Sequence, residues 1–529
     1  MEHAVAAGDH EYIAETVEKA FRAMTGLTDV SYASFLRWIA ALPPDVLRPR
    51  WMLRLLASRM MYVHGETEAA LIALNELEAE LRAAPDAAAS QPILALIPAD
   101  RASYALLRGE LRNAIAFGRG MLAGQPAENH IGRARALALV AMAELRRGEV
   151  AAADVAFAEA ADEAVHSQAP IVAVPFICSR AEIRLMQGRL REACEFNQHA
   201  MQIGPAEGRG LGVRGFALLG LAKILYEWND LAVAEERVRS GLELLNQGGI
   251  TEAFGAGYGV LALIQQAAGD PAGAAASADL AVHLARASGL ARPISEAGAY
   301  RARVWLAQGR VDNAGAWPAE LARLDVGEAL REFEELAVAR VLLAQGEAKR
   351  ALALLQRLEA AARSAGRLGR GLEAAVLRSL ALEASGDPAA ASAALEASLR
   401  QAEPEGYVRV FLDAGPGMAA LLQRLAERPS VAAYARRLLA AVGSAAVVEG
   451  RPARPAAVEG QDAPLAEAPS DRELEVLRLL ASDLSVPEIA ARLIVAPSTV
   501  RSHIKQLYQI LNAHSRFEAV QRARQLGLI

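Results

Sequence analysis

The side chains with the clearest chemical potential lie near the C-terminus. Ser498, Arg501, Ser502, Lys505 and Gln509 recur at intervals that place them on one face of a helix. This face carries two cations and no carboxylate, and its hydroxyl, amide and cationic groups can donate to phosphate oxygens and base edges. Thr499 adds a second hydroxyl at the start of the helix. An ordinary solvated helix surface has a similar composition, so the face needs a supporting context.

The opposite side of this helix provides that context. Val500, Ile504, Leu507 and Leu511 are separated by four, three and four residues, which predicts one buried stripe. Pro497 suits the first helical position, because its missing N–H would have no partner there. A short helix over 486–493 and a turn through 494–495 precede it. The order predicts a helix-turn-helix whose second helix enters the DNA major groove.

Three repeated start signals divide the last sixty residues into short helices. Ser-x-x-Glu boxes occur at 470–473, 485–488 and 515–518. In such a box the serine oxygen accepts a first-turn N–H and the glutamate accepts the serine N–H, which contributes about 1 kcal/mol. Together with the helix from Pro497, they predict a four-helix unit.

These residues resemble the LuxR-type helix-turn-helix family, in the order RELEVL, EIA, STV, HI and LY between Arg472 and Tyr508. The resemblance covers residues 470–529. It implies a DNA-binding domain that pairs on two half-sites, often through its last helix, here 517–526. The implied DNA contacts are Ser498, Thr499, Arg501, Ser502, Lys505 and Gln509. Ala496 replaces a usual capping serine, and Ile510 replaces a usual cation.

A second pattern organises most of the remaining chain. A glycine followed five residues later by an alanine recurs with a period near 40, and Asn229 takes the glycine position once. Glycine ends a helix where φ is positive, and a small alanine lets the next helix approach closely. The frame predicts stacked helical hairpins, a TPR-like α-solenoid with helices or linkers longer than in a 34-residue repeat. The pairs are Gly65/Ala70, Gly109/Ala114, Gly148/Ala153, Gly188/Ala193, Asn229/Ala234, Gly269/Ala274, Gly309/Ala314, Gly346/Ala351 and Gly386/Ala391.

The stretch 402–415, AEPEGYVRVFLDAG, interrupts this frame and resembles the end of the sensor solenoid in MalT-like regulators. Residues 3–15 and 35–50 resemble the start of the same solenoid. That resemblance implies an NTPase module before the solenoid, and we expect this chain to lack it. None of its four lysines follows a glycine and precedes Ser or Thr, so no P-loop can be written.

Composition sets the remaining bounds. The net charge is −6, divided into +2 for residues 470–529 and −8 for the rest, which fits an acidic body with a modest DNA-binding tail. No apolar run of eighteen residues or N-terminal signal occurs, so we expect a cytoplasmic, nucleoid-associated protein without a membrane partner. Cys178 and Cys194 are expected to be buried thiols.

The sequence therefore predicts an all-α chain with three parts: a TPR-like repeat domain over 1–442, a flexible linker over 443–468 and a LuxR-type domain over 469–529. The leading hypothesis is a transcriptional regulator that binds double-stranded DNA as a homodimer, with RNA polymerase as a candidate partner. The solenoid would bind either a small-molecule effector or a protein. The rival hypothesis is an adaptor whose terminal helices bind protein. We expect no enzyme activity, cofactor or metal, because no catalytic arrangement or ligand spacing is found.

Tryptophans and histidines leave smaller questions. The five tryptophans, Trp38, Trp51, Trp228, Trp305 and Trp317, either line a ligand groove or fill gaps between hairpins, and we favour the second interpretation. The histidines are scattered singly, which is typical of surface or core positions.

Overall fold

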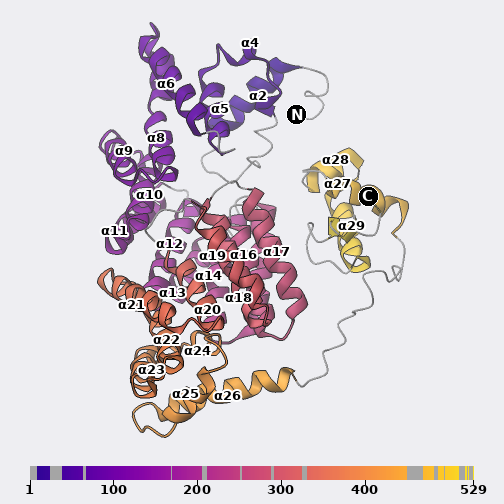
Figure 1. The fold of residues 1–529 in the computed structure, drawn as a ribbon. Helices are drawn as coiled ribbons and strands as arrows, with labels where there is room; N and C mark the ends of the chain where they lie inside the picture. The colour runs from indigo at the N-terminus through magenta and orange to yellow at the C-terminus, as the bar shows by residue number, and fades with distance from the viewer. Residues whose placement is uncertain are drawn as a thin grey trace. The chain divides into compact units, whose positions relative to one another are not determined.

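The computed structural model describes residues 9–23, 38–63, 67–167, 170–204, 211–248, 250, 253–287, 291–324, 331–449, 469–481, 486–493, 495–511, 519–520, 522–523 and 528. All regular secondary structure in these ranges is helical, so the all-α prediction is confirmed. The chain divides into two compact units, a solenoid (1–448) and a C-terminal unit (449–529). Each is described by itself (Figure 1).

The solenoid is a succession of helical hairpins, as the repeat frame predicted (Figure 1). Four of the second helices are 17 residues long, which helps to explain a period near 40. Before the regular hairpins come α2 (His10–Ala23), α4 (Pro44–Leu47), α5 (Trp51–Val63), α6 (Thr67–Ala83) and α7 (Ala87–Leu94). The hairpins are α8 (Ile97–Leu107) with α9 (Leu111–Ala123), α10 (His130–Arg146) with α11 (Val150–His166), α12 (Ala173–Met186) with α13 (Leu190–Ile203), α14 (Arg214–Glu227) with α15 (Leu231–Gln247), α16 (Phe254–Ala267) with α17 (Pro271–Ala287), α18 (Ala291–Ala307) with α19 (Val311–Leu321), α20 (Glu332–Ala344) with α21 (Ala348–Ser364) and α22 (Leu368–Ala384) with α23 (Pro388–Ala402).

The turns of these eight hairpins have the predicted conformation. Each anchor glycine from Gly109 to Gly386 has a φ between 71° and 86°, and Asn229 has a φ of 64°. The residue after the anchor donates its N–H to the carbonyl five positions earlier, as from Asp230 to Leu225 at 2.9 Å. This bond satisfies a carbonyl that the helix end would otherwise leave free. Gly65 lies outside the described residues.

The anchor alanines also occupy the predicted positions. Ala70 and all eight alanines from Ala114 to Ala391 are at most 1% exposed. A methyl group at this point lets the second helix of each hairpin lie close against the first. First helices also contact the first helices of neighbouring hairpins, as α16 contacts α18 and α18 contacts α20. Stacking of neighbours therefore builds the core, as expected of a repeat array.

The interruption at 402–415 has a specific place in the solenoid. It forms a 3₁₀ turn, Glu403–Glu405, and α24 (Arg409–Leu412), and we call residues 403–413 the strap. The strap lies against α13 and α14, almost two hundred residues earlier: Val408 N–H donates to Glu227 O at 2.8 Å, and Arg191 Nε donates to Pro404 O at 3.1 Å. In Figure 1, α24 lies beside α22 and α14.

A second contact joins the same distant parts of the chain. The turn at Gly188 meets the start of α22, where a Cβ added to Gly369 would lie 2.4 Å from Leu185 O. Arg367 Nη1 donates to Gly148 O at 3.3 Å. The superhelix thus brings α22 onto hairpins five and six repeats earlier.

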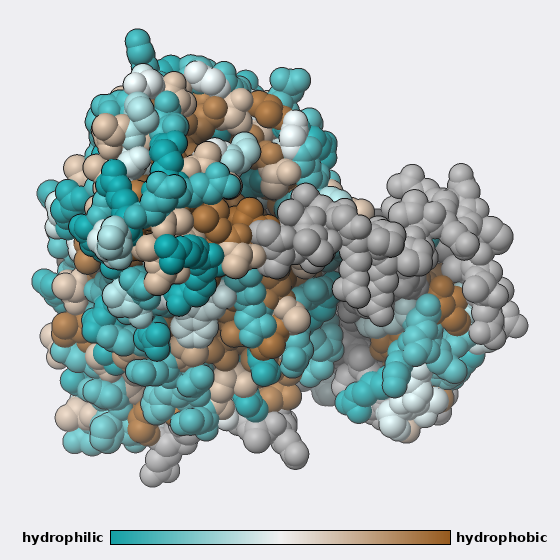
Figure 2. Space-filling view, turned by 90° about the horizontal axis from the view of Figure 1, so that it is seen from below, coloured by the Kyte–Doolittle hydropathy of each residue, from teal (hydrophilic) through white to brown (hydrophobic). Residues whose placement is uncertain are grey.

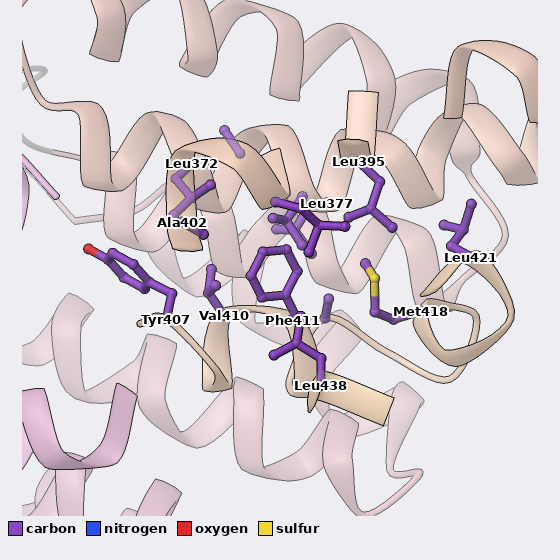
Figure 3. Packing of buried hydrophobic residues seen from close by; sticks show 14 of the residues in the cluster. Leu372, Leu377, Leu395, Ala402, Tyr407, Val410, Phe411, Met418, Leu421 and Leu438 are labelled. Carbon is purple, nitrogen blue, oxygen red and sulfur yellow. The ribbon is translucent and has the colours of Figure 1, made fainter. Parts of the chain in front are cut away.

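The end of the solenoid packs behind the strap. Its last helices are α25 (Met418–Leu425) and α26 (Ala432–Glu449). Phe411, fully buried, lies with Leu377 on one side and Leu438 on the other (Figure 3). Residues of α13 and α14 belong to the same core cluster, so the strap is held by apolar packing as well as by hydrogen bonds.

The end of α26 differs from the sequence-based boundary. The predicted linker began at 443, after a fading helical pattern, but α26 continues to Glu449. The run SAAVVE contains alanine and glutamate, which favour helix, and this local preference extends the helix by seven residues. Residues 450–468 lie outside the described residues, so a flexible linker there stays a prediction.

The surface and the cysteines complete the description. In the face shown in Figure 2, hydrophilic residues are interspersed with apolar ones across the solenoid. Among the described residues, no helix combines the length and apolar character needed to cross a membrane.

Cys178 and Cys194 are free thiols, and burial raises the pKa of Cys178 to about 12. Of the tryptophans, Trp38 and Trp317 are at most 8% exposed and fill core positions.

Candidate nucleic-acid interface

The C-terminal unit is built around three helices, α27 (Asp471–Leu480), α28 (Val486–Leu493) and α29 (Pro497–Ile510). Their apolar faces meet in one core, in which Val476, Ile489, Val500 and Leu507 are fully buried. Leu511 is 1% exposed and Ile504 packs at the edge, so the predicted stripe of α29 is confirmed. A fourth helix was predicted over 517–526; residues 519–520 and 522–523 are helical, and the others lie outside the described residues.

The first predicted capping box is confirmed. Ser470 N–H donates to Glu473 Oε2 at 2.8 Å, and Glu473 N–H donates to Ser470 Oγ at 3.4 Å. Hydrogen bonds from the Ser470 hydroxyl and N–H hold the pKa of the Glu473 carboxyl below its usual value. The boxes at 485–488 and 515–518 involve residues outside the described ones.

Two bonds fix the helix-turn-helix. Arg472 Nη2, on α27, donates to Leu493 O at 2.8 Å, where α28 ends and its carbonyls lack helical partners. Val495 N–H donates to Ala490 O at 3.0 Å across the turn. Since both bonds involve the turn before α29, they set the direction in which α29 leaves it.

α29 begins as predicted, with Pro497 at its first position and Ala496 before it. Ala496 has an extended backbone, with φ −69° and ψ 145°, but no side-chain cap. The first-turn N–H groups of α29 therefore have no side-chain acceptor at this end. Free N–H groups at a helix start are suited to an anion such as a phosphate.

Five of the six predicted contact residues share one face of α29 by helical spacing, and Thr499 lies beside them in the first turn. Ser498, Thr499, Arg501, Ser502, Lys505 and Gln509 are all exposed. Ser502 Oγ donates to Ser498 O at 3.2 Å. Among the described residues, neither Arg501 nor Lys505 forms an ion pair. The face thus presents two uncompensated cations beside hydroxyl and amide donors, opposite a buried stripe.

Two features of α29 were not predicted. Gln506 is also exposed, and its position one turn after Ser502 could have added it to the polar side of α29. His503 is partly buried: its Nδ1 has no hydrogen-bond partner among the described residues, and its proximity contributes to the lowered pKa of the Glu473 carboxyl on α27. A lone histidine gives no sequence signal for such a contact.

Each of the two units matches a known protein family. The MalT-like TPR region model matches residues 95–428, which is more than half of the chain. The chain belongs to the family with a MalT-like TPR region. The model for bacterial regulatory proteins of the luxR family matches residues 469–523. The chain therefore carries a MalT-like TPR region followed by a segment that matches the luxR family, and both predicted resemblances are confirmed.

Individual relatives agree with this division. The regulator MalT of Vibrio cholerae is 26% identical over 372 residues, which cover 66% of this chain and 40% of MalT. The probable transcriptional regulatory protein NarL of Mycobacterium tuberculosis is 46% identical over 67 residues, 13% of this chain and 31% of NarL. The chain thus spans less than half of these relatives. Among solved structures, a Rap protein in complex with competence and sporulation factor aligns with 76% of this chain and 99% of its own, at 15% identity and a TM-score of 0.40.

Proposed function

We propose that this chain regulates transcription by sequence-specific binding of α29 in the major groove of double-stranded DNA. The observation that carries the proposal is the exposed face of α29, whose two cations have no carboxylate partner among the described residues. This face is supported by its setting, because α29 follows the turn of a helix-turn-helix and buries its opposite stripe in the core of the C-terminal unit.

The proposed roles follow from position on the helix. Ser498 and Thr499, in the first turn, donate to a phosphate together with free N–H groups of the helix start. Arg501 and Ser502 face base edges, and Arg501 has the forked guanidinium that pairs with guanine. Lys505 and Gln509, one and two turns further, contact phosphate or a neighbouring base.

The proposal extends to assembly and sensing. Two copies would bind paired half-sites, with the region of 517–526 as the candidate dimer contact, and RNA polymerase is a candidate partner of the bound dimer. The solenoid would bind the effector, since MalT-like regulators carry their sensor in this region. The adaptor hypothesis, in which α29 binds protein, is less well supported, because the polar face of α29 lacks the large apolar anchors that dominate protein interfaces.

The test is genomic pull-down sequencing with the full chain, followed by binding of the enriched site at several salt concentrations. Arg501→Ala should cost about 1–3 kcal/mol and relax the preference at one base pair. Lys505→Ala should weaken binding to all sequences and reduce the salt slope by about one. Arg478→Ala, an exposed arginine on α27, is the matched control and should bind as the wild type does. Unchanged binding in both α29 variants would remove the proposal.

A further inference from the structure

A cavity of about 450 Å³ lies in the solenoid between α17, α18 and α19. Its size falls within the range of small-molecule sites. Arg286 of α17, Arg301 of α18 and Arg323 after α19 line it, together with a single carboxylate, Glu320. Most of the remaining wall is apolar and includes Trp317. The lining therefore combines an excess of positive charge with an apolar body.

Arg301 is the buried cation of this cavity. Its side chain is only 14% exposed, yet its nearest carboxylate oxygens, on Asp279 and Glu320, lie 3.7 and 3.8 Å away. Both distances are too long for hydrogen bonds. Its Nε is buried and has no hydrogen-bond partner among the described residues. A buried polar group without a partner destabilises the folded state, so its presence calls for an explanation.

Two other arginines of the solenoid show what a satisfied guanidinium looks like. Unsatisfied Nε atoms also occur elsewhere among the described residues, at Arg331, Arg340 and Arg409. Arg367 Nε lies 2.8 Å from both carboxylate oxygens of Glu332. Arg59 donates to Asp100 from Nε at 2.6 Å and from Nη2 at 2.9 Å. Arg301 has two carboxylates nearby and donates to neither. The Nη groups of Arg301, which make these long contacts, are therefore the donors available to an acceptor that enters the cavity.

Aromatic packing against Trp305 holds the guanidinium of Arg301 in place without a hydrogen bond to either carboxylate. Its Cζ lies 4.5 Å from the ring centroid of Trp305, one turn further along α18. Stacking of this kind orients a guanidinium without using its N–H donors. Trp317 is 2% exposed and lies against Gly298, where an added Cβ would be 2.2 Å from the indole nitrogen. The cation and the apolar wall are therefore fixed before a ligand binds, which lowers the entropy cost of binding.

We infer that this cavity binds a small organic carboxylate, with the carboxylate on Arg301 and an apolar body against the Trp317 wall. Arg286 is 60% exposed and Arg323 is also exposed, so both stand at the mouth, where they attract an anion. Glu320 lies 4.0 Å from Arg286 and 3.8 Å from Arg301, and Asp279 lies 3.7 Å from Arg301, so two carboxylates stand against three guanidiniums. A carboxylate accepts two parallel hydrogen bonds from one guanidinium, which a neutral amide cannot reproduce.

The inference deepens the proposed sensing role, on which its regulatory meaning rests, by naming the chemistry of the ligand. The probe is 4-phenylbutyrate, with its neutral amide as the comparison, and binding is measured on the full chain by calorimetry and saturation-transfer NMR. We expect the carboxylate to bind and the amide to bind at least about tenfold more weakly. Equal binding of the two probes, or binding of neither, would overturn the inference.

Variants locate the site. Arg301→Met keeps the stem of the side chain and removes the guanidinium, so 4-phenylbutyrate binding should fall about tenfold or more. Arg310→Met is the matched control: Arg310 also lies over the Trp305 ring, at 5.6 Å, but is exposed and does not line the cavity. If Arg301→Met does not fold, the exposed Arg323→Met should still bind about threefold more weakly. Full affinity in both variants contradicts the inference.

A parallel measurement separates this inference from DNA binding. Arg501→Ala should keep 4-phenylbutyrate binding while losing operator affinity, since the substitution lies in the other unit. Operator affinity without carboxylate binding in the wild type would reject the cavity site and leave the DNA proposal intact. Carboxylate binding without operator affinity in the wild type would reject the DNA proposal and leave the cavity site intact.

Discussion

Trp228 Nε1 donates a hydrogen bond to Glu405 O at 2.9 Å, across 177 positions of the sequence. Trp228 is the residue after the end of α14, and Glu405 ends the 3₁₀ turn that begins the strap. The neighbouring Gly406 has a φ of 76°, which turns the chain so that Tyr407 and Val408 continue along α14. A tryptophan that the sequence assigned to gap filling therefore also fixes the strap to a distant hairpin.

Trp228→Phe should loosen this contact. The change keeps an aromatic ring and removes the indole N–H, leaving the Glu405 carbonyl without this donor. The free energy of unfolding should fall by about 0.5–1.5 kcal/mol, measured by urea denaturation. Hydrogen exchange should increase in the strap and at the end of α14. Trp51 lies far from the strap in sequence, so Trp51→Phe should leave hydrogen exchange in the strap unchanged. If Trp51→Phe increased that exchange as much as Trp228→Phe does, the Trp228–Glu405 bond would not be what holds the strap.

Glu227 gives the strap contact a pH dependence. Burial, followed by the nearby carboxylates of Asp413 and Glu373, raises the pKa of Glu227 to about 7. The folded state thus favours the neutral carboxyl. Its contribution to stability is complete below about pH 4.5 and is lost as the pH rises through 7.

Glu227→Gln should therefore remove this loss. We expect the Tm of the variant to exceed that of the wild type at pH 8, and the difference to shrink toward pH 5. Glu236→Gln, at a glutamate whose side chain is 63% exposed, is the control and should follow the wild-type profile. A constant difference between Glu227→Gln and wild type across this range would show that Glu227 does not titrate there.

Two glycines should respond to alanine with opposite signs. Gly346 has a φ of 77°, and an added Cβ would meet nothing within 4 Å. Gly346→Ala therefore tests backbone conformation alone and should destabilise the solenoid by about 1–2 kcal/mol. Gly120, inside α9, also has open space around an added Cβ, and Gly120→Ala should stabilise by about 0.5–1 kcal/mol. Chemical denaturation measures the change in the free energy of unfolding for both variants. If both variants were stabilised or both destabilised, the claim that Gly346 is needed for its positive φ would be contradicted.

Ala496→Ser should strengthen the start of α29. The backbone at Ala496 already has the extended conformation of an N-cap, so a serine oxygen can accept a first-turn N–H. We expect a gain of about 0.5–1 kcal/mol for the C-terminal unit, measured by its thermal unfolding in the full chain. Ala481→Ser, after the end of α27, lacks this geometry and should give no gain.

The hairpin repeat could be predicted from the sequence because the residues that specify each turn are close together in the chain. A positive φ requires glycine or asparagine, and a close helix approach requires alanine, so Gly269 and Ala274 specify their hairpin within six residues. The polar face of α29 was predictable for the same reason, since spacing decides which side chains share a helix face.

The features that escaped prediction depend on distant parts of the chain. The strap was recognised as an interruption, but nothing in residues 403–413 indicates that Trp228 or Glu227 is their partner. The cavity beside Arg301 depends on how three helices diverge, which periodicity does not determine. Gly366, with a φ of 69°, forms a further turn between α21 and α22 and lies outside the Gly-x4-Ala frame, because residue 371 is a glycine.

The backbone contact between the Gly188 turn and Gly369 changes how the solenoid should lose its structure. A linear repeat array frays from its ends, because each repeat is stabilised only by its neighbours. Here α22 cannot detach without exposing the turn of a hairpin near the middle of the array. Hairpins from α12 to α23 should therefore melt as one cooperative block, and fraying should be confined to the N-terminal helices before α12.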